Sequence, residues 1–143
     1  MALRTTHARS QLMSAVRRSG TVPELLVRRL LTAVGLRYRL NVRGLPGTPD
    51  IVNQRRHLIV FVHGCFWHRH RGCRLTTSPK RNRVFWSSKF AANIARDNRN
   101  HAALRRLGFT VVTVWQCETA NPGKLSRRLV RLLGDRHHRA AAD

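Results

Sequence analysis

Acidic residues are scarce in this chain of 143 residues, which carries 28 arginines and lysines against 6 aspartates and glutamates. A formal net charge of +22 repels itself unless a polyanion neutralises it. Lysine is scarce as well: only Lys80, Lys89 and Lys124 occur. Almost all of the positive charge is therefore arginine, whose planar guanidinium matches a phosphate with two hydrogen bonds. The composition indicates a nucleic-acid partner, and a merely solvated basic surface is the alternative.

Long apolar runs are also missing. None approaches the roughly 18 residues of a membrane-spanning helix, and the N-terminus lacks the apolar core of a signal peptide, so we expect no membrane association. There are only three cysteines, an odd number that leaves one unpaired in a secreted protein. Three cysteines and one histidine, however, make a complete tetrahedral zinc set. That set favours a reducing, intracellular compartment, and three reduced core cysteines without a metal are the alternative.

The length fits one domain with a proper core, and the chain has no internal repeat. Alternating helical and strand patterns predict an α/β domain with a small, mostly buried sheet flanked by helices. We expect a basic arm at residues 1–8, the domain at 9–134 and a frayed tail at 135–143. The expected helices lie at residues 10–18, 21–35, 84–107 (bent near Asp97) and 122–133, and the expected strands at 36–42, 50–52, 57–63 and 109–115.

The segment from His63 to Cys73 holds three histidines, two cysteines and two large aromatic residues. Imidazole and thiolate are the side chains that zinc prefers, and imidazole also exchanges its proton near neutral pH. One loop could therefore hold a structural metal and still leave histidines for chemistry. Phe66 and Trp67, in its middle, are too large and apolar for an ordinary surface loop.

Asp50 follows Pro49 at the start of a predicted strand, and His63 ends the next strand. Adjacent antiparallel strands would bring these two residues close together. A carboxylate among so many cations would be a hard oxygen ligand for magnesium. A turn aspartate held by local N–H groups is an equally good explanation of Asp50 by itself.

Several segments, in the same order along the chain, resemble the very-short-patch repair (Vsr) DNA mismatch endonucleases from about residue 7 to 133. The most specific is His-Gly-Cys-Phe-Trp-His at residues 63–68. The others are residues 9–16, residues 45–50, Phe85 and Trp86 with Lys89, Asn93, Arg96 and Asp97, and residues 114–117. The resemblance implies a fold like that of type II restriction endonucleases. It also implies a magnesium-dependent nick in one strand beside a thymine mispaired with guanine, the product of 5-methylcytosine deamination.

The resemblance assigns a magnesium ion to Asp50 and to the backbone carbonyl of Val62. His63 and His68 match the catalytic histidines, which orient or deprotonate the attacking water and contact phosphate; which of them is the general base stays open. Restriction-type sites usually add a lysine on the strand after the aspartate. That strand has no lysine here, so histidine must carry the proton, as in the repair family.

Two more carboxylates match the family's site. Asp97 corresponds to one that supports the magnesium shell, and Glu24 to a helix glutamate at the site. Each has a plainer explanation. Asp97 could form a surface ion pair with Arg96, and Glu24 could be a first-turn carboxylate that the helix dipole favours.

The zinc set implied by the family match is Cys65, His70, Cys73 and Cys117. It would fasten the aromatic loop to the end of the last strand. His68 lies only two residues from His70, so the choice between these histidines depends on the length of the loop. We assign His70 to zinc and His68 to catalysis.

Phe66 and Trp67 resemble the family's wedge, which enters the major groove and unstacks the bases beside the mismatch, where unstacking costs least. Met13 would enter the minor groove opposite. The alternatives are that one of the two aromatics caps the core and that Met13 is a core residue of a helix. Trp86 and Trp115 are expected in the core.

The implied partners are double-stranded DNA with a T:G mismatch, a functionally linked cytosine-5 DNA methyltransferase and mismatch-repair proteins. We expect a monomer, because one nick needs one site, in the cytoplasm of a prokaryote at the nucleoid. A restriction-type endonuclease without mismatch preference and a non-catalytic, zinc-stapled nucleic-acid-binding module are the alternatives. The binding module does not explain why Glu24, Asp50 and Asp97 all fall on an active-site pattern.

Overall fold

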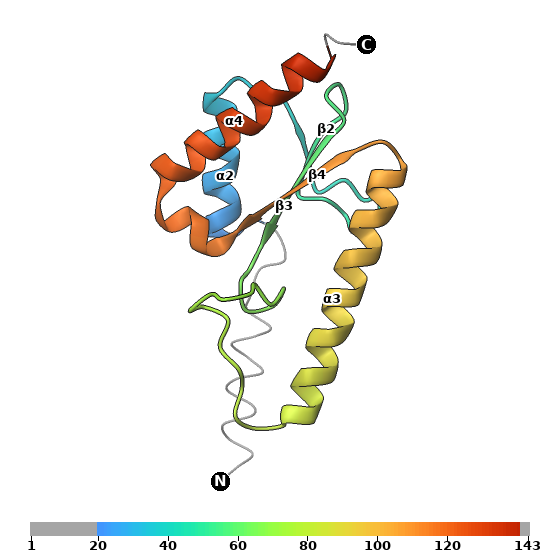
Figure 1. The fold of residues 1–143 in the computed structure, drawn as a ribbon, viewed down its shortest axis with the longest axis vertical. Coiled ribbons are helices and arrows are strands. Elements are labelled where there is room, and N and C mark those ends of the chain that lie inside the picture. The colour runs from blue at the N-terminus through green and yellow to red at the C-terminus, as the bar shows by residue number, and fades with distance from the viewer. Residues whose placement is uncertain (1–19, 141–143) are drawn as a thin grey trace.

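The computed structural model describes residues 20–140, and their side chains as far as Gly134. In this part of the chain three α-helices pack around one four-stranded sheet (Figure 1). In chain order the elements are α2 (Val22–Ala33), β1 (Arg39–Leu40), β2 (Ile51–Asn53), β3 (Leu58–His63), α3 (Arg83–Arg106), β4 (Thr110–Trp115), the 3-10 helix η1 (Gln116–Ala120) and α4 (Pro122–Ala140). The predicted single α/β domain with a small mixed sheet is confirmed. The basic arm, the helix expected at residues 10–18 and Met13 lie outside the described residues.

The sheet order is β1-β2-β3-β4, with antiparallel pairing up to β3 and parallel pairing between β3 and β4. A parallel pair needs a long crossover connection, and α3 provides it. The register pairs His63 with Trp115, so β3 and β4 finish side by side. Asp50 immediately precedes the oppositely directed β2, which puts it at this same end of the sheet.

The sheet is covered on both faces. Helices α2 and α4 lie over one face and α3 over the other (Figure 1). Neighbouring residues of β3 therefore enter different cores: Val60 packs with Leu31 of α2, and Ile59 packs with Leu104 of α3. The continuous apolar run of β3 is thus buried on both sides, as the sequence predicts.

Helix α2 begins and ends where the sequence predicts. The Thr21 hydroxyl accepts a hydrogen bond from the Glu24 backbone N–H at 3.3 Å, and Pro23 occupies the first turn. Gly35 follows the helix with a φ of +83°, a conformation that costs glycine little. These local signals set where α2 begins and ends, and so place Glu24 in its first turn.

Three elements differ from expectation, two in their boundaries and one in the bend expected near Asp97. Strand β1 is limited to two exposed edge residues instead of residues 36–42. Helix α3 runs from Arg83 to Arg106 as a single helix, and Asp97 lies within it with its side chain bonded to His68. Helix α4 continues past Leu133 to Ala140; one interior glycine costs only about 1 kcal/mol, too little to end a helix by itself.

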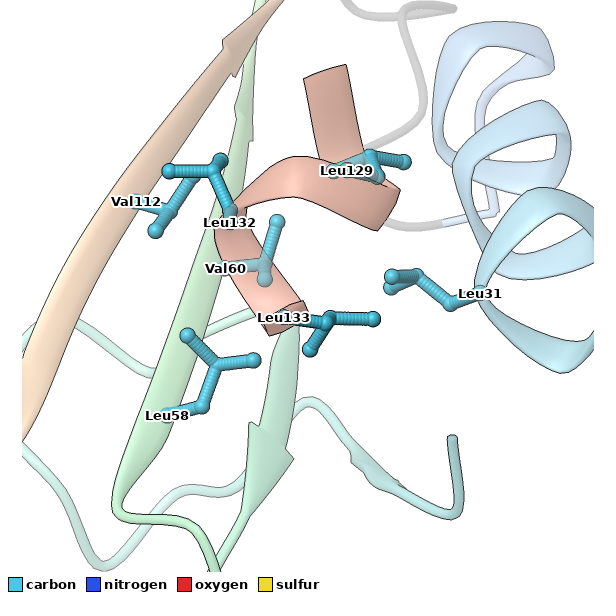
Figure 2. A pocket seen from close by; sticks show the side chains of 7 residues that line it. All are labelled: Leu31, Leu58, Val60, Val112, Leu129, Leu132 and Leu133. Carbon is cyan, nitrogen blue, oxygen red and sulfur yellow. The ribbon is translucent and has the colours of Figure 1, made fainter. Parts of the chain in front are cut away.

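An apolar cavity of about 10 Å³ lies between β3, β4 and the helices α2 and α4. Only leucine and valine side chains line it (Figure 2). That volume is at the lower limit for one water molecule and has no polar group to hold one. We therefore place the functional site elsewhere. No helix of the described residues is long and apolar enough to cross a bilayer.

Candidate active site and metal centre

Asp50 is partly buried at the mouth of the sheet. Its Oδ2 accepts a hydrogen bond of 2.7 Å from the backbone N–H of Val62 on the adjacent strand. Burial raises the pKa of Asp50 from 3.8 to about 6, and the negative charge of Glu24 adds to this shift. The Val62 N–H and the charges of His68 and Arg28 oppose it. The protein thus holds two carboxylates close together in a poorly solvated place, where a cation would relieve their repulsion.

Glu24 is only 2% exposed. Its Oε1 accepts a hydrogen bond of 2.6 Å from Arg28, one helical turn along α2. Its Oε2 accepts a 2.9 Å bond from the backbone N–H of Gly20. The two explanations of Glu24 are therefore compatible, because this carboxylate satisfies the start of α2 and also acts electrostatically on Asp50.

Two histidines lie face to face beside this carboxylate pair. The rings of His63 and His68 are 3.8 Å apart between centroids and inclined by only 7°. The Nδ1 of His68 is 2.7 Å from Oδ2 of Asp97 on α3. Although burial raises the pKa of Asp97, the hydrogen bond and charge of His68 lower it below its ordinary value. An ionised Asp97 accepts a hydrogen bond from the Nδ1–H of His68, which leaves the lone pair on Nε2 and lets that nitrogen act as a base.

His63 is 5% exposed, and burial followed by repulsion from His68 lowers its pKa to about 3. It is therefore neutral at neutral pH. The nitrogens of His63 and His68 and the Asp97 carboxylate are close enough to share a cation. A metal must lie near the plane of each imidazole that binds it, however, and two parallel rings 3.8 Å apart cannot both direct a lone pair at one ion. The arrangement therefore suits proton transfer through His68 and Asp97 better than the binding of one ion by both histidines.

A second cluster contains all three cysteines and one histidine. The ligand atoms of Cys65, His70, Cys73 and Cys117 all lie within 4.8 Å of one another. Nδ1 of His70 is 3.7 Å from Sγ of Cys65 and 3.4 Å from Sγ of Cys117. Tetrahedral zinc with ordinary bond lengths places sulfur and nitrogen ligands about 3.6 Å apart. The structure thus brings together the four residues predicted to bind zinc, while His68 turns to Asp97.

The thiols of this cluster have different surroundings. Burial raises the pKa of Cys65 to about 12. Cys73 is half-buried, and a hydrogen bond from the backbone N–H of Leu75 leads the effects that lower its pKa to about 6. A divalent cation would stabilise all three thiolates. The ring of Trp115 stacks on His70 at 4.2 Å and 9°, which fixes the plane of that imidazole.

The predicted wedge residues are half-buried in an aromatic cluster. Phe66 contacts Trp67 edge-on at 5.2 Å and Phe90 at 5.4 Å. Trp86 is 6.1 Å from both Phe66 and Trp67. Phe85, on the first turn of α3, is 59% exposed beside Trp86. The loop therefore rests on the first half of α3 and does not extend freely into solvent.

Cations border these rings. The Lys89 ammonium is 5.4 Å from the centroid of Trp67, and the Arg69 guanidinium is 4.0 Å from that of Phe90. Asn93 donates a 3.4 Å hydrogen bond to the carbonyl of Trp67. Positive charge beside aromatic surface suits a nucleic acid, which offers phosphates and stacked bases together.

The structure gathers every predicted site residue that it describes at one end of the sheet. The prediction that Asp50 approaches the end of β3 is confirmed through Val62, whereas the use of the Val62 carbonyl as a metal ligand stays a prediction. The prediction that Trp86 and Trp115 lie in the core is wrong, since both side chains are only partly buried and contact residues of the site loop. The sequence also gave no reason to select His101, which borders His63.

Known proteins resemble this chain over most of its length. The family description "DNA mismatch endonuclease Vsr" matches residues 1–74. The type II nicking enzyme V.XorIIP of Xanthomonas oryzae is 51% identical over 87% of this chain and 91% of its own. The type II nicking enzyme V.NmeAIP of Neisseria meningitidis is 42% identical over 90% of this chain and 91% of its own.

The DNA mismatch endonuclease Vsr of Escherichia coli is 38% identical over 82% of this chain and 75% of its own. The carboxylates, the histidine pair and the cysteine cluster described above fit a nuclease of this kind. The chain belongs to the Vsr DNA mismatch endonuclease family and is a DNA endonuclease.

Proposed function

We propose that this endonuclease nicks one strand of duplex DNA beside a T:G mismatch, with magnesium as its catalytic ion. The observation that carries the proposal is the meeting of three groups at one end of the sheet. Asp50 and Glu24 form a carboxylate pair, His68 is bonded to Asp97, and an aromatic cluster lies on the adjoining loop.

The residues around Asp50 fit a hard divalent cation. The raised pKa of Asp50 shows that nearby hydrogen bonds and positive charges do not fully offset the cost of burying its negative charge. Its Oδ2 is engaged by the Val62 N–H, and we propose that Oδ1 and the Val62 carbonyl hold magnesium, with Glu24 close behind. Magnesium, when bound, neutralises the scissile phosphate and makes water a better nucleophile.

We assign the proton transfer to His68. Asp97 holds its Nδ1–H, so Nε2 carries the lone pair that accepts a proton from the attacking water. His63, neutral and buried against His68, keeps that ring in plane and offers a hydrogen bond toward the phosphate. This division of labour replaces the strand lysine of restriction-type sites.

Mismatch preference would come from the aromatic loop. Phe66 and Trp67 present a large, rigid, half-buried surface beside the cations Lys89 and Arg69. Inserting such rings between base pairs costs a few kcal/mol per step, and the cost is lowest where pairing is already weak. Met13, which lies outside the described residues, is proposed to enter the opposite groove.

We propose that zinc occupies the cysteine cluster. The sulfur–nitrogen distances of 3.4 and 3.7 Å suit a tetrahedral ion. Zinc held there by Cys65, His70, Cys73 and Cys117 would join residues 65–73 to η1, which follows β4 directly. It would hold both the aromatic loop and His68, which lies between two ligands in sequence, in a fixed position.

The wider setting follows from the same proposal. The fold would be that of the restriction-type endonucleases, and a monomer would suffice for one nick. The T:G substrate implies a cytosine-5 DNA methyltransferase in the same cell, and mismatch-repair proteins are the further proposed partners. The enzyme would then act at the nucleoid in the cytoplasm.

The proposal is tested with two duplexes of identical sequence, one fully paired and one with a single T:G mismatch. Each is incubated with magnesium and with the wild type, Asp50→Ala or Asn98→Ala, and nicks are mapped on both strands. We expect one nick in the T-containing strand of the mismatched duplex, with Asp50→Ala inactive. Asn98 is exposed one residue beyond Asp97 on α3, so Asn98→Ala should behave as wild type.

Equal nicking of the two duplexes would support a restriction-type endonuclease without mismatch preference and overturn the assignment of the aromatic loop. Tight binding without nicking in magnesium would support a binding module. Nicking by Asp50→Ala at the wild-type rate would remove Asp50 from the catalytic set.

A further inference from the structure

His101 is a titratable side chain next to the candidate site for which the proposed chemistry has no use. It lies on α3, half-buried, with its ring 5.7 Å from that of His63 and inclined by 21°. The His101 ring also stacks on the ring of Phe61, with 4.8 Å between the centroids and an inclination of 28°. His63 is therefore bordered by two nearly parallel imidazoles, His68 and His101.

The Nε2 of His101 is buried, and no protein group within hydrogen-bonding distance pairs with it. Leaving a buried polar atom without a partner costs about 1–3 kcal/mol, whereas an apolar side chain of similar size would avoid that cost. Burial also lowers the pKa of His101, so the ring is neutral at neutral pH. Stability alone therefore gives no reason for a histidine here.

Helix α3 explains the position. His101 comes four residues after Asp97, so both side chains leave the same face of the helix one turn apart. Asp97 bonds to His68, and His101 lies along His63. One helix thus supplies one partner to each member of the stacked histidine pair.

We propose that His101 is a positioning residue: its ring, stacked beside His63, holds that histidine parallel to His68 during strand cleavage. The inference rests on the proposed function, since it takes His63 to act in the reaction. We assign this role to the ring and not to Nε2, because Nε2 has no partner to position. Loss of the ring should let His63 tilt, and a displacement on the ångström scale can slow a reaction by up to about 10²-fold.

The test compares two replacements that both remove the unpaired nitrogen. His101→Phe keeps a planar ring, and His101→Leu does not. We expect both variants to unfold at or above the wild-type temperature. We expect His101→Phe to keep a kcat close to that of the wild type, and His101→Leu to lose about tenfold in kcat with an unchanged KM. Initial rates are measured with the T:G duplex in excess over the enzyme at several duplex concentrations, which gives kcat and KM, and kcat is divided by the folded fraction.

His57→Asn is the control, because it removes an imidazole from the far end of β3 at a φ of +50° that asparagine tolerates. Equal kcat for His101→Phe and His101→Leu, whether high or low, would overturn the inference. So would a loss of rate that follows the folded fraction alone. His63→Ala separates the two proposals: if it is inactive while His101→Leu is fully active, only the inference fails, and if it nicks normally, the assigned role of His63 fails first.

Discussion

At the scale of single residues, the site is built from ionisable groups held where their charges are poorly solvated. Burial is the chief cause of two shifts: it raises the pKa of Asp50 and lowers the pKa of His63. The shift of Asp50 lowers the stability of the folded protein at neutral pH, and the shift of His63 lowers it below about pH 6.5, where the unfolded chain would bind a proton that the folded protein does not. Such a cost is common at catalytic sites, where the geometry serves a ligand that the free protein lacks.

Asp50→Asn should stabilise the magnesium-free protein at neutral pH while abolishing nicking. Because the pKa of Asp50 rises from 3.8 to about 6 on folding, its favourable contribution is full below pH 3.8 and is lost as the pH rises through about 6. The asparagine oxygen can still accept the Val62 N–H bond. Urea unfolding measures the difference in unfolding free energy between Asp50→Asn and the wild type. The difference should be near zero at pH 4, and the variant should be more stable by on the order of 3 kcal/mol above pH 6.

Asp97→Asn is the matched comparison, because the shift of its pKa has the opposite sign. A lowered carboxylate pKa contributes stability above the unfolded-state pKa, and the contribution is lost as the pH falls. Asp97→Asn should therefore destabilise the protein at pH 7 and approach the wild type in acid. Curves of the same sign for the two variants would contradict the assigned environments.

At the scale of elements, helix α3 organises much of the site, because it contacts the aromatic loop, the histidine pair and the loop that precedes Asp50. Its first turns carry the aromatic cluster, and its middle carries Asp97 and His101. Farther along, Asn100 packs against the loop that leads into Asp50. A Cβ added to Gly47 of that loop would lie 3.0–3.1 Å from three atoms of the Asn100 side chain.

Gly47→Ala should therefore lower both stability and activity. Gly47 has a φ of +77°, and its missing Cβ makes room for Asn100. We expect a loss of about 1–3 kcal/mol from the strained backbone and the close contact, together with slower nicking because Asp50 follows three residues later. Thermal unfolding and single-turnover rates measure the two effects.

Gly44→Ala in the same loop is the control. A Cβ at Gly44 meets no atom within 4 Å, and its φ is not in the left-handed range. It should leave rate and unfolding temperature close to wild type. Equal effects of the two substitutions would show that the loop does not depend on the contact with Asn100.

The elements also show what sequence could predict. Helix α2 has a cap, a proline and a glycine stop, and β3 has a continuous apolar run, so local residues determine both. The metal cluster was predictable because three of its ligands lie within nine residues of one another. His101 carried no such signal, because its importance arises from ring contacts with β3, which is distant in sequence. The exposed edge strand β1 was overpredicted, since an apolar alternation does not reveal where pairing ends.

At the scale of the whole molecule, the cysteine cluster joins the loop after β3 to the end of β4. If zinc occupies this cluster as proposed, its removal should loosen the aromatic loop and lower the unfolding temperature; zinc contributes on the order of 10 kcal/mol to folding in zinc-finger peptides. His70→Ala should lose the ion and His68→Ala should keep it, because only the Nδ1 of His70 faces the sulfurs. Elemental analysis of the purified variants measures this, and equal zinc loss in both would refute the assignment.

The charge of the whole molecule and the aromatic loop should act on different parts of DNA binding. Glu24, Asp50 and Asp97 lie at the site, and Glu118 is paired with Arg128, so within the described side chains no acid is left to offset the surface arginines. Affinity for a fully paired duplex should then fall steeply with salt, with a log–log slope of about −0.9 for each phosphate contacted.

The double variant Phe66→Ala/Trp67→Ala should keep this salt slope, because it removes no charge. It should bind the mismatched and the paired duplex with equal affinity, so that the ratio of the two affinities falls to about one, since the preference depends on the low energy cost of inserting the rings at a weakened base step. Fluorescence anisotropy over a range of potassium chloride concentrations, in magnesium-free buffer, measures both quantities. A changed slope with an unchanged ratio would mean that the arginines, and not the aromatic rings, read the mismatch.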